Sequence, residues 1–167
     1  MTTVFVSKRL GLAMTDSRAT NTHPRFFLGF FQLTPKTTRT VVPQKALYIH
    51  DRLFLACGNV STITLIMRYL TEHKMPDIPK DCPSCECLLL GKEYAIHMYI
   101  DKGKFHKKTL YLKPDFCFIM GSGYDHLFWV KGHKYLPYFS PDFVIDAFRN
   151  VCTKDKYTDD NINLYGF

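Results

Sequence analysis

The sequence predicts an α+β fold in which helices cover the outer faces of two β-sheets. Three observations predict it. Short segments rich in β-branched and aromatic residues recur along the chain, two other segments repeat apolar residues at helical spacing, and turn-forming residues separate them. Two sheets with helices on their outer faces bury all of these apolar stripes. The order of the elements alone is compatible with many other α+β folds.

The first part of the chain predicts two hairpins. One joins strands at Thr2–Ser7 and Leu12–Asp16, and the other joins Lys45–Ile49 and Arg52–Cys57. Residues 20–43 lie between them and contain three prolines and many threonines. We expect this segment to be a long, partly extended excursion that packs on a neighbour or on a binding cleft.

Two helices are predicted, one on each side of a second group of strands. The first begins after Asn59 and ends by His73, and the second opens at Ser140 and Pro141, which suit the N-cap and the first turn. A short helix is also expected between Gly123 and Val130. The remaining β pattern predicts strands at Leu88–Leu90, Ala95–Ile100, Thr109–Leu112, Phe116–Met120 and Asn161–Tyr165.

Length and composition are those of a folded, globular protein. At 167 residues we expect one domain spanning residues 1–167, and 46% hydrophobic with 22% charged residues argues against disorder. The first fifteen residues do not have the pattern of a secretory signal, and no window approaches the ~20 apolar residues of a membrane-spanning helix. We therefore expect a cytoplasmic protein with reduced cysteines and no membrane partner.

The net charge of +7 raises the question whether the protein binds nucleic acid. Basic residues interleaved with aromatics in the second half can form a nucleic-acid site, but on a basic protein they more often form a solvated face. A basic nucleic-acid-binding protein is therefore an alternative that the sequence does not favour. The lysines concerned are Lys102, Lys104, Lys107, Lys108, Lys113, Lys131 and Lys134.

The cysteines offer two further alternatives. Cys82, Cys85 and Cys87 have zinc-like spacing, but a structural zinc site needs four ligands and no second cysteine pair follows. We expect no metal and no other cofactor, and these three thiols are the only candidates, with a surface loop of free thiols as the simpler interpretation. Cys57 could act as a nucleophile only if exposed, and its apolar neighbours predict burial.

The start of the chain contains a candidate catalytic residue. If Met1 is removed, Thr2 presents a hydroxyl and an α-amine on one residue. The amine, with a pKa near ~7.7–8, can accept the hydroxyl proton without a separate histidine. Many chains have threonine after methionine without using it, so this feature needs support from other residues.

Three further positions provide candidate support for Thr2. A hairpin would return Asp16 to the N-terminus, unless Asp16 merely caps a polar turn. Lys45 begins an otherwise apolar strand, and an ammonium beside Thr2 would favour loss of the hydroxyl proton; an ordinary strand-edge lysine and Lys36 are the alternatives. Gly58 ends a strand at a helix start, where free N–H groups suit an oxyanion hole.

Four segments resemble one family in order and spacing. Residues 2–20, with Asp-Ser-Arg-Ala-Thr at positions 16–20, are similar to the start of proteasome β-subunits and bacterial HslV-type peptidases. Residues 56–59 resemble the small-residue turn that follows the lysine strand of that family. Residues 119–123 resemble its Ile-Gly-Ser-Gly signature, and residues 155–158, followed by 162–165, resemble its Asp-x-Tyr-Ser segment and next strand.

This resemblance implies a four-layer αββα sandwich of two mainly antiparallel sheets flanked by helices, the fold of N-terminal-nucleophile hydrolases, in a compact bacterial or phage-like form. It implies a peptidase whose Thr2 is nucleophile and base and forms an acyl-enzyme with peptide substrates. Lys45 and Asp16 would support Thr2, Gly58 would supply an oxyanion N–H, and the polar network around the amine would comprise Ser122, Asp155 and Thr158.

The resemblance also implies assembly. We expect a ring-shaped homo-oligomer, with an ATP-dependent unfoldase as a possible partner. The alternative within the same fold is a catalytically inactive scaffold subunit, which Asn59 and the pair Asp159-Asp160 would favour because the family has glycines there.

Overall fold

The computed structural model describes residues 2–16, 18–27, 31–41, 46–74, 77–124, 139–155, 158 and 161–167, with the backbone alone for 18–27 and 31–41. Two sheets form the body of the molecule, and all of their strand pairs are antiparallel. The first has the order β10-β1-β2-β11 and the second β5-β6-β7-β8-β9. The first sheet comprises β1 (Thr3–Ser7), β2 (Leu12–Asp16), β10 (Cys117–Gly121) and β11 (Ile162–Gly166), and the second β5 (Ala46–Ile49), β6 (Arg52–Gly58), β7 (Cys85–Leu90), β8 (Tyr94–Asp101) and β9 (Lys104–Tyr111).

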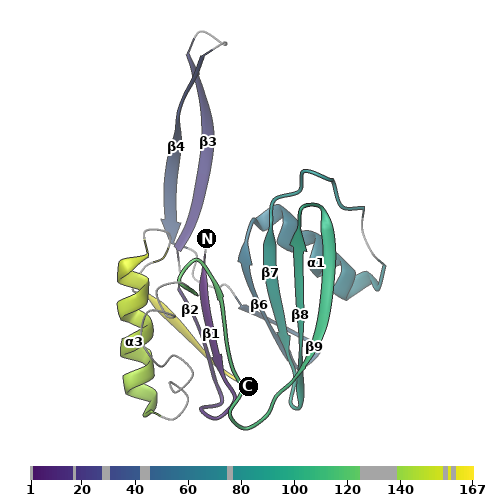
Figure 1. Ribbon diagram of the computed structural model, residues 1–167, viewed down its shortest axis with the longest axis vertical. Coiled ribbons are helices and arrows are strands. Elements are labelled where there is room, and N and C mark those ends of the chain that lie inside the picture. The colour runs from purple at the N-terminus through teal and green to yellow at the C-terminus, as the bar shows by residue number, and fades with distance from the viewer. Residues whose placement is uncertain are drawn as a thin grey trace.

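Helices α1 (Val60–Glu72) and α3 (Pro141–Lys154) form the two outer layers (Figure 1). Helix α3 packs on the first sheet and α1 on the second. The predicted four-layer αββα sandwich is therefore confirmed. Asn59 and Ser140 are the N-caps of the two helices, as the sequence predicts. Within the described ranges, no helix combines the length and the apolar composition that crossing a membrane requires.

The alternation of side chains along β1 explains how the layers pack. Val4 and Val6 point into the core between the sheets, where they meet residues such as Leu55 and Leu88. Phe5, between them in sequence, points to the opposite face and packs under α3 with Phe148. A strand that is buried on both faces has a continuous run of apolar residues, and Val4, Phe5 and Val6 of β1 form such a run.

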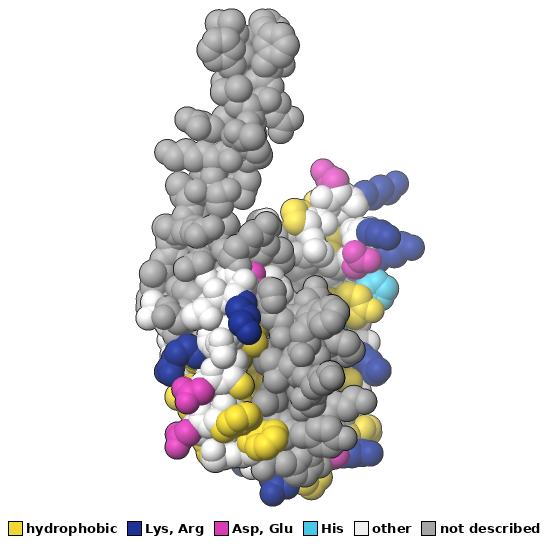
Figure 2. All heavy atoms as spheres, turned by 60° about the vertical axis from the view of Figure 1, so that its left-hand side comes forward, with side chains coloured by type: hydrophobic (Ala, Val, Ile, Leu, Met, Phe, Trp, Pro, Cys, Tyr) yellow, Lys and Arg dark blue, Asp and Glu magenta, His cyan; other side chains and the backbone are white. Residues whose placement is uncertain are grey.

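The outer face of α3 is polar, as an outermost layer requires. Asp146 and Arg149 form an exposed ion pair of 2.9 Å, and charged side chains are scattered over this side of the molecule (Figure 2). Two exposed phenylalanines, Phe139 and Phe143, contact each other at the start of the helix, with tilted rings whose centroids are 4.6 Å apart.

The segment expected as a long, partly extended excursion contains a long hairpin that was not predicted. Among the described strands, β3 (Arg18–Phe27) and β4 (Phe31–Val41) pair only with each other, and they project away from the two sheets (Figure 1). The register shifts between His23 and Arg25, so that Pro24 lies in a bulge, where its missing N–H is tolerated. The prolines therefore interrupt the ladder locally without ending the strands.

Strand β9 is also longer than expected, because it begins at Lys104 rather than Thr109. It is an edge strand whose residues are mostly exposed, so its first half lacks the apolar alternation by which a strand is recognised. The short helix expected before Val130 falls largely outside the described residues.

Candidate functional site

Thr2 immediately precedes β1, which is an inner strand of the first sheet. The residue is buried, with 7% of its surface exposed. Its carbonyl oxygen accepts a hydrogen bond of 3.3 Å from the backbone N–H of Ser122. The loop after β10 therefore holds the beginning of the chain in place.

Asp16 contacts the start of β1 from β2, the strand that pairs with β1 on the side opposite β10. The β1–β2 hairpin returns the chain so that the backbone N–H of Thr3 donates to Asp16 Oδ1 at 2.8 Å. Asp16 is fully buried, and Ile162 of β11 is opposite it in the sheet. The buried Asp16 side chain therefore fixes the backbone at Thr3, one residue after Thr2.

The loop Gly121-Ser122-Gly123 can approach β1 only because its outer members are glycines. Gly121 has φ +94°, and a Cβ atom there would collide with the Thr2 carbonyl oxygen. A Cβ at Gly123 would collide with the side chain of Thr3, whose Oγ1 instead accepts the Gly123 N–H at 2.9 Å. The glycine signature in the sequence thus has a direct steric cause.

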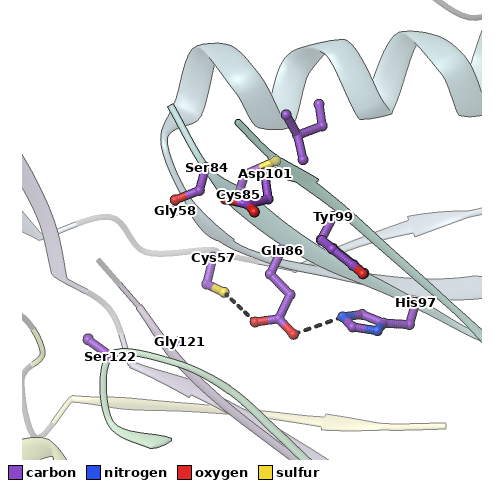
Figure 3. A pocket seen from close by; sticks show the side chains of 11 residues that line it. Cys57, Gly58, Ser84, Cys85, Glu86, His97, Tyr99, Asp101, Gly121 and Ser122 are labelled. Carbon is purple, nitrogen blue, oxygen red and sulfur yellow. Dashed lines mark hydrogen bonds and ion pairs between the residues drawn. The ribbon is translucent and has the colours of Figure 1, made fainter. Parts of the chain in front are cut away.

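A cavity of about 600 Å³ lies between the two sheets at this end of β1 (Figure 3). Ser122, which binds Thr2, lines it from the first sheet, and Gly58 lines it from the second. Gly58 ends β6 immediately before the N-cap of α1 and has φ +109°, with the Cys85 backbone too close for a side chain. The other lining residues are Cys57, Ser84, Cys85, Glu86, His97, Tyr99, Ile100, Asp101 and Gly121.

A partly buried acid–base pair in this cavity was not predicted from the sequence. Glu86 Oε1 and His97 Nε2 lie 2.8 Å apart on the adjacent strands β7 and β8. Glu86 is on the same face of β7 as Leu88 and Leu90, which belong to the core between the sheets. The sequence signal for this pair is that a glutamate and a histidine occupy positions of apolar strands that face the other sheet.

Cys57 is not suited to nucleophilic chemistry. Its Sγ lies 4.0 Å from Glu86 Oε2, and the residue is 4% exposed. Burial, and then the negative charge of Glu86, raises the pKa of the Cys57 thiol well above its usual range. The thiol therefore stays protonated at neutral pH, which argues against the nucleophilic-cysteine alternative.

Asp155 and Thr158 lie at the end of α3 and do not line the cavity. Asp155 is the C-cap residue and is 4% exposed. The Thr158 hydroxyl donates to the carbonyl oxygens of Cys152 and Asp155, at 2.9 and 3.2 Å, so it satisfies backbone groups at the helix end. Lys45 lies outside the described residues, and only the backbone of Lys36 is described.

The cysteines considered for zinc are mostly not in a surface loop. Cys85 and Cys87 are buried on β7 and face α1, and Cys82 precedes the strand with its Sγ 3.3 Å from Thr62 Oγ1. A hydrogen bond between the two strand thiols lowers the pKa of Cys85 and raises that of Cys87. In the part of the chain that is described, no three His, Cys, Asp or Glu side chains are grouped as metal ligands.

Two solved structures share this architecture. HslV from Trypanosoma brucei superimposes with a TM-score of 0.53 over 98% of this chain and 97% of that chain, at 12% sequence identity. The chain has the fold of HslV. BPH from Thiobacillus denitrificans, solved in complex with epoxomicin, gives a TM-score of 0.51 over 100% and 98% of the two chains at 9% identity. The HslV fold agrees with the family named from the sequence motifs, although no protein-family model and no curated protein matches the sequence.

Proposed function

We propose that the protein is a threonine-type N-terminal-nucleophile hydrolase, a peptidase that cleaves amide bonds through an acyl-enzyme on Thr2 after removal of Met1. The observation that supports it most is the position of Thr2. Its carbonyl is bound by Ser122 at the edge of a 600 Å³ cavity, and Asp16 binds the next backbone N–H. The HslV fold and the epoxomicin complex of BPH add support.

In the proposed mechanism, the α-amine of Thr2 takes the proton of the Thr2 hydroxyl as the oxygen attacks the substrate carbonyl carbon. The tetrahedral intermediate breaks its C–N bond, and the amine returns the proton to the leaving nitrogen. Water then attacks the ester by the same route and releases the carboxylic acid and free Thr2. Lys45, held by Asp16, stabilises the developing negative charge, and an N–H near Gly58 binds the oxyanion.

Ser122 fits a role in orienting the amine. Its Oγ is buried and has no hydrogen-bond partner among the described residues, although its backbone N–H binds Thr2. A buried hydroxyl without a partner is uncommon, and an α-amine exposed by processing would supply one. Asp155 completes this network in the proposal, while Thr158 acts indirectly by fixing the backbone at the end of α3.

Mass spectrometry of the purified protein tests the proposal. We expect loss of one methionine and a single epoxomicin adduct on Thr2. Thr2→Ala should remove both the adduct and peptidase activity, and Lys45→Ala should come close to that result. Thr3→Ser is the matched control, since it keeps the hydroxyl that accepts the Gly123 N–H.

A protein that retains Met1, takes no adduct and cleaves no peptide would contradict the proposal. That result would point instead to a non-catalytic scaffold subunit with the same fold.

A further inference from the structure

The cavity lined by Gly58 and by Ser122, whose N–H binds the Thr2 carbonyl, differs in charge from the whole chain. The whole protein carries +7, but the cavity is lined by two carboxylates, Glu86 and Asp101, and by no lysine or arginine among the described residues. His97 is the one basic side chain in the lining, and it is already bound to Glu86. A negative cavity in a positive protein favours a cationic guest.

The Glu86 carboxylate is positioned to accept a hydrogen bond from a cationic group in the cavity. Its Oε1 is bound to His97 Nε2 at 2.8 Å, while its Oε2 has, among the described residues, only the thiol of Cys57, a weak donor, at 4.0 Å. The Glu86 side chain is 33% exposed, against 16% for His97. Figure 3 shows the carboxylate between these two neighbours, so one oxygen retains acceptor capacity toward a guest.

The neighbours of Glu86 keep it in this position. The His97 ring packs edge-on against Phe118 with centroids 5.0 Å apart, and it also contacts Tyr99 at 5.3 Å. Tyr99 in turn stacks on His106 at 4.5 Å. A carboxylate bound to a ring that is itself packed on both sides loses little entropy when it binds a partner.

We propose that this cavity is a substrate-specificity pocket for a basic side chain, lysine or arginine, of the cleaved peptide, with Glu86 as its principal partner. The inference rests on the proposed peptidase function. Asp101 adds a second negative charge, and Tyr99 lines the wall along which the methylene stem of the guest lies. An arginine guanidinium also gains from an aromatic face such as that of Tyr99.

Fluorogenic peptides that differ at one position only, with arginine, lysine, norleucine or glutamate on either side of the cleaved bond, test the pocket. We expect kcat/KM for the best arginine or lysine peptide to exceed that of the norleucine peptide by about tenfold to a hundredfold, as expected for a charge-assisted hydrogen bond. Glu86→Gln should reduce this ratio to near one, and Asp101→Asn should reduce it by less.

Asp146→Asn is the matched control. Asp146 is an exposed carboxylate on α3, remote from the cavity lining, and its loss should leave the ratio unchanged. If Glu86→Gln does not fold, the exposed Asp101→Asn still tests the charge dependence.

The outcomes separate the two proposals. Epoxomicin labelling of Thr2 with no preference for basic peptides, or with a preference that survives both substitutions, overturns the pocket and leaves the peptidase proposal standing. Absence of labelling and of all cleavage overturns the peptidase proposal, and the pocket with it.

Discussion

Gly121 and the Thr2 carbonyl are closer than any side chain at position 121 would allow. The glycine combines a φ of +94° with a Cβ position that overlaps the carbonyl oxygen. Both conditions penalise every other residue, and the second acts directly on the backbone at the proposed nucleophile.

We expect Gly121→Ala to lower the free energy of unfolding by at least about 1–3 kcal/mol, the usual strain of a disfavoured backbone conformation. Because the added methyl group would displace Thr2, labelling by epoxomicin should fall as well. Urea denaturation and intact-mass analysis measure the two effects.

Gly166→Ala is the matched control for this change. A Cβ at Gly166 has its nearest neighbour at 4.0 Å, and no positive φ is involved. If both variants unfold at the same urea concentration, the steric argument at Gly121 is wrong.

The thiols should differ in reactivity. Burial raises the pKa of Cys117 to about 12, and the pKa of Cys57 is also raised well above the usual range, by burial first. Because the thiolate is the reactive form, a raised pKa slows alkylation at neutral pH. We expect iodoacetamide at pH 7.5 to modify Cys82, which is partly exposed, before Cys57 or Cys117. Peptide mapping measures the order, and alkylation of Cys57 at the rate of Cys82 would contradict it.

At the residue level, the sequence could predict contacts made by local geometry. Asp16 returns to β1 through one tight hairpin, and Gly58 lies at a strand-to-helix junction marked by Asn59. The Glu86–His97 pair depends on the register of β7 and β8 and on which face meets the other sheet. Neither property follows from local spacing, so the cavity and its charge could not be predicted.

Among the elements, α3 depends on one large buried side chain. Phe148 is 1% exposed and packs with Phe5 and Met14 of the first sheet. Along the same helix, Phe143 is 49% exposed. Two phenylalanines five positions apart therefore have opposite environments.

We expect Phe148→Ala to lower the free energy of unfolding by about 3–5 kcal/mol, because it leaves a cavity under α3. Phe143→Ala is the control on the same helix and should lower the free energy by no more than about 1.5 kcal/mol, since the exposed side chain loses mainly its contact with Phe139. Chemical denaturation followed by circular dichroism measures both. Equal losses would mean that α3 does not pack on the sheet through its Phe148 face.

The elements that were predicted well are those with a buried stripe. Helix α1 and strands β1 and β6 bury one or both faces, and apolar periodicity reports burial. Strand β9 is exposed at an edge, and the β3–β4 hairpin is interrupted by prolines and lies outside the sheets. Solvated strands carry no such stripe, and the sequence therefore indicated them poorly.

For the whole molecule, the β3–β4 hairpin bears on assembly. It forms a separate two-stranded sheet, and isolated hairpins of this kind are marginally stable in water. We infer that it packs on a neighbouring subunit of a homo-oligomeric ring, the assembly that the resemblance to HslV-type peptidases implies. An unfoldase partner would be a separate question from ring formation.

We expect the purified protein to be a homo-oligomer by mass photometry, and we expect replacement of residues 20–40 by a short Gly-Ser linker to lower its mass to that of smaller assemblies. Circular dichroism should show that the two body sheets survive, since neither pairs with β3 or β4. A monomeric parent protein would contradict the inference, and so would a shortened variant with unchanged assembly.

The way Thr2 is held has a chemical consequence. The contacts that fix position 2 involve the main chain of Thr2 and Thr3 and not the Thr2 side chain. The Thr2 carbonyl oxygen accepts the Ser122 N–H and lies against Gly121, and the Thr3 N–H donates to the Asp16 carboxylate. Serine or cysteine could occupy the same point without disturbing any of them. If residue 2 is the nucleophile, as proposed, the backbone contacts fix the position of its reactive atom equally well for a hydroxyl oxygen and for a thiol sulfur.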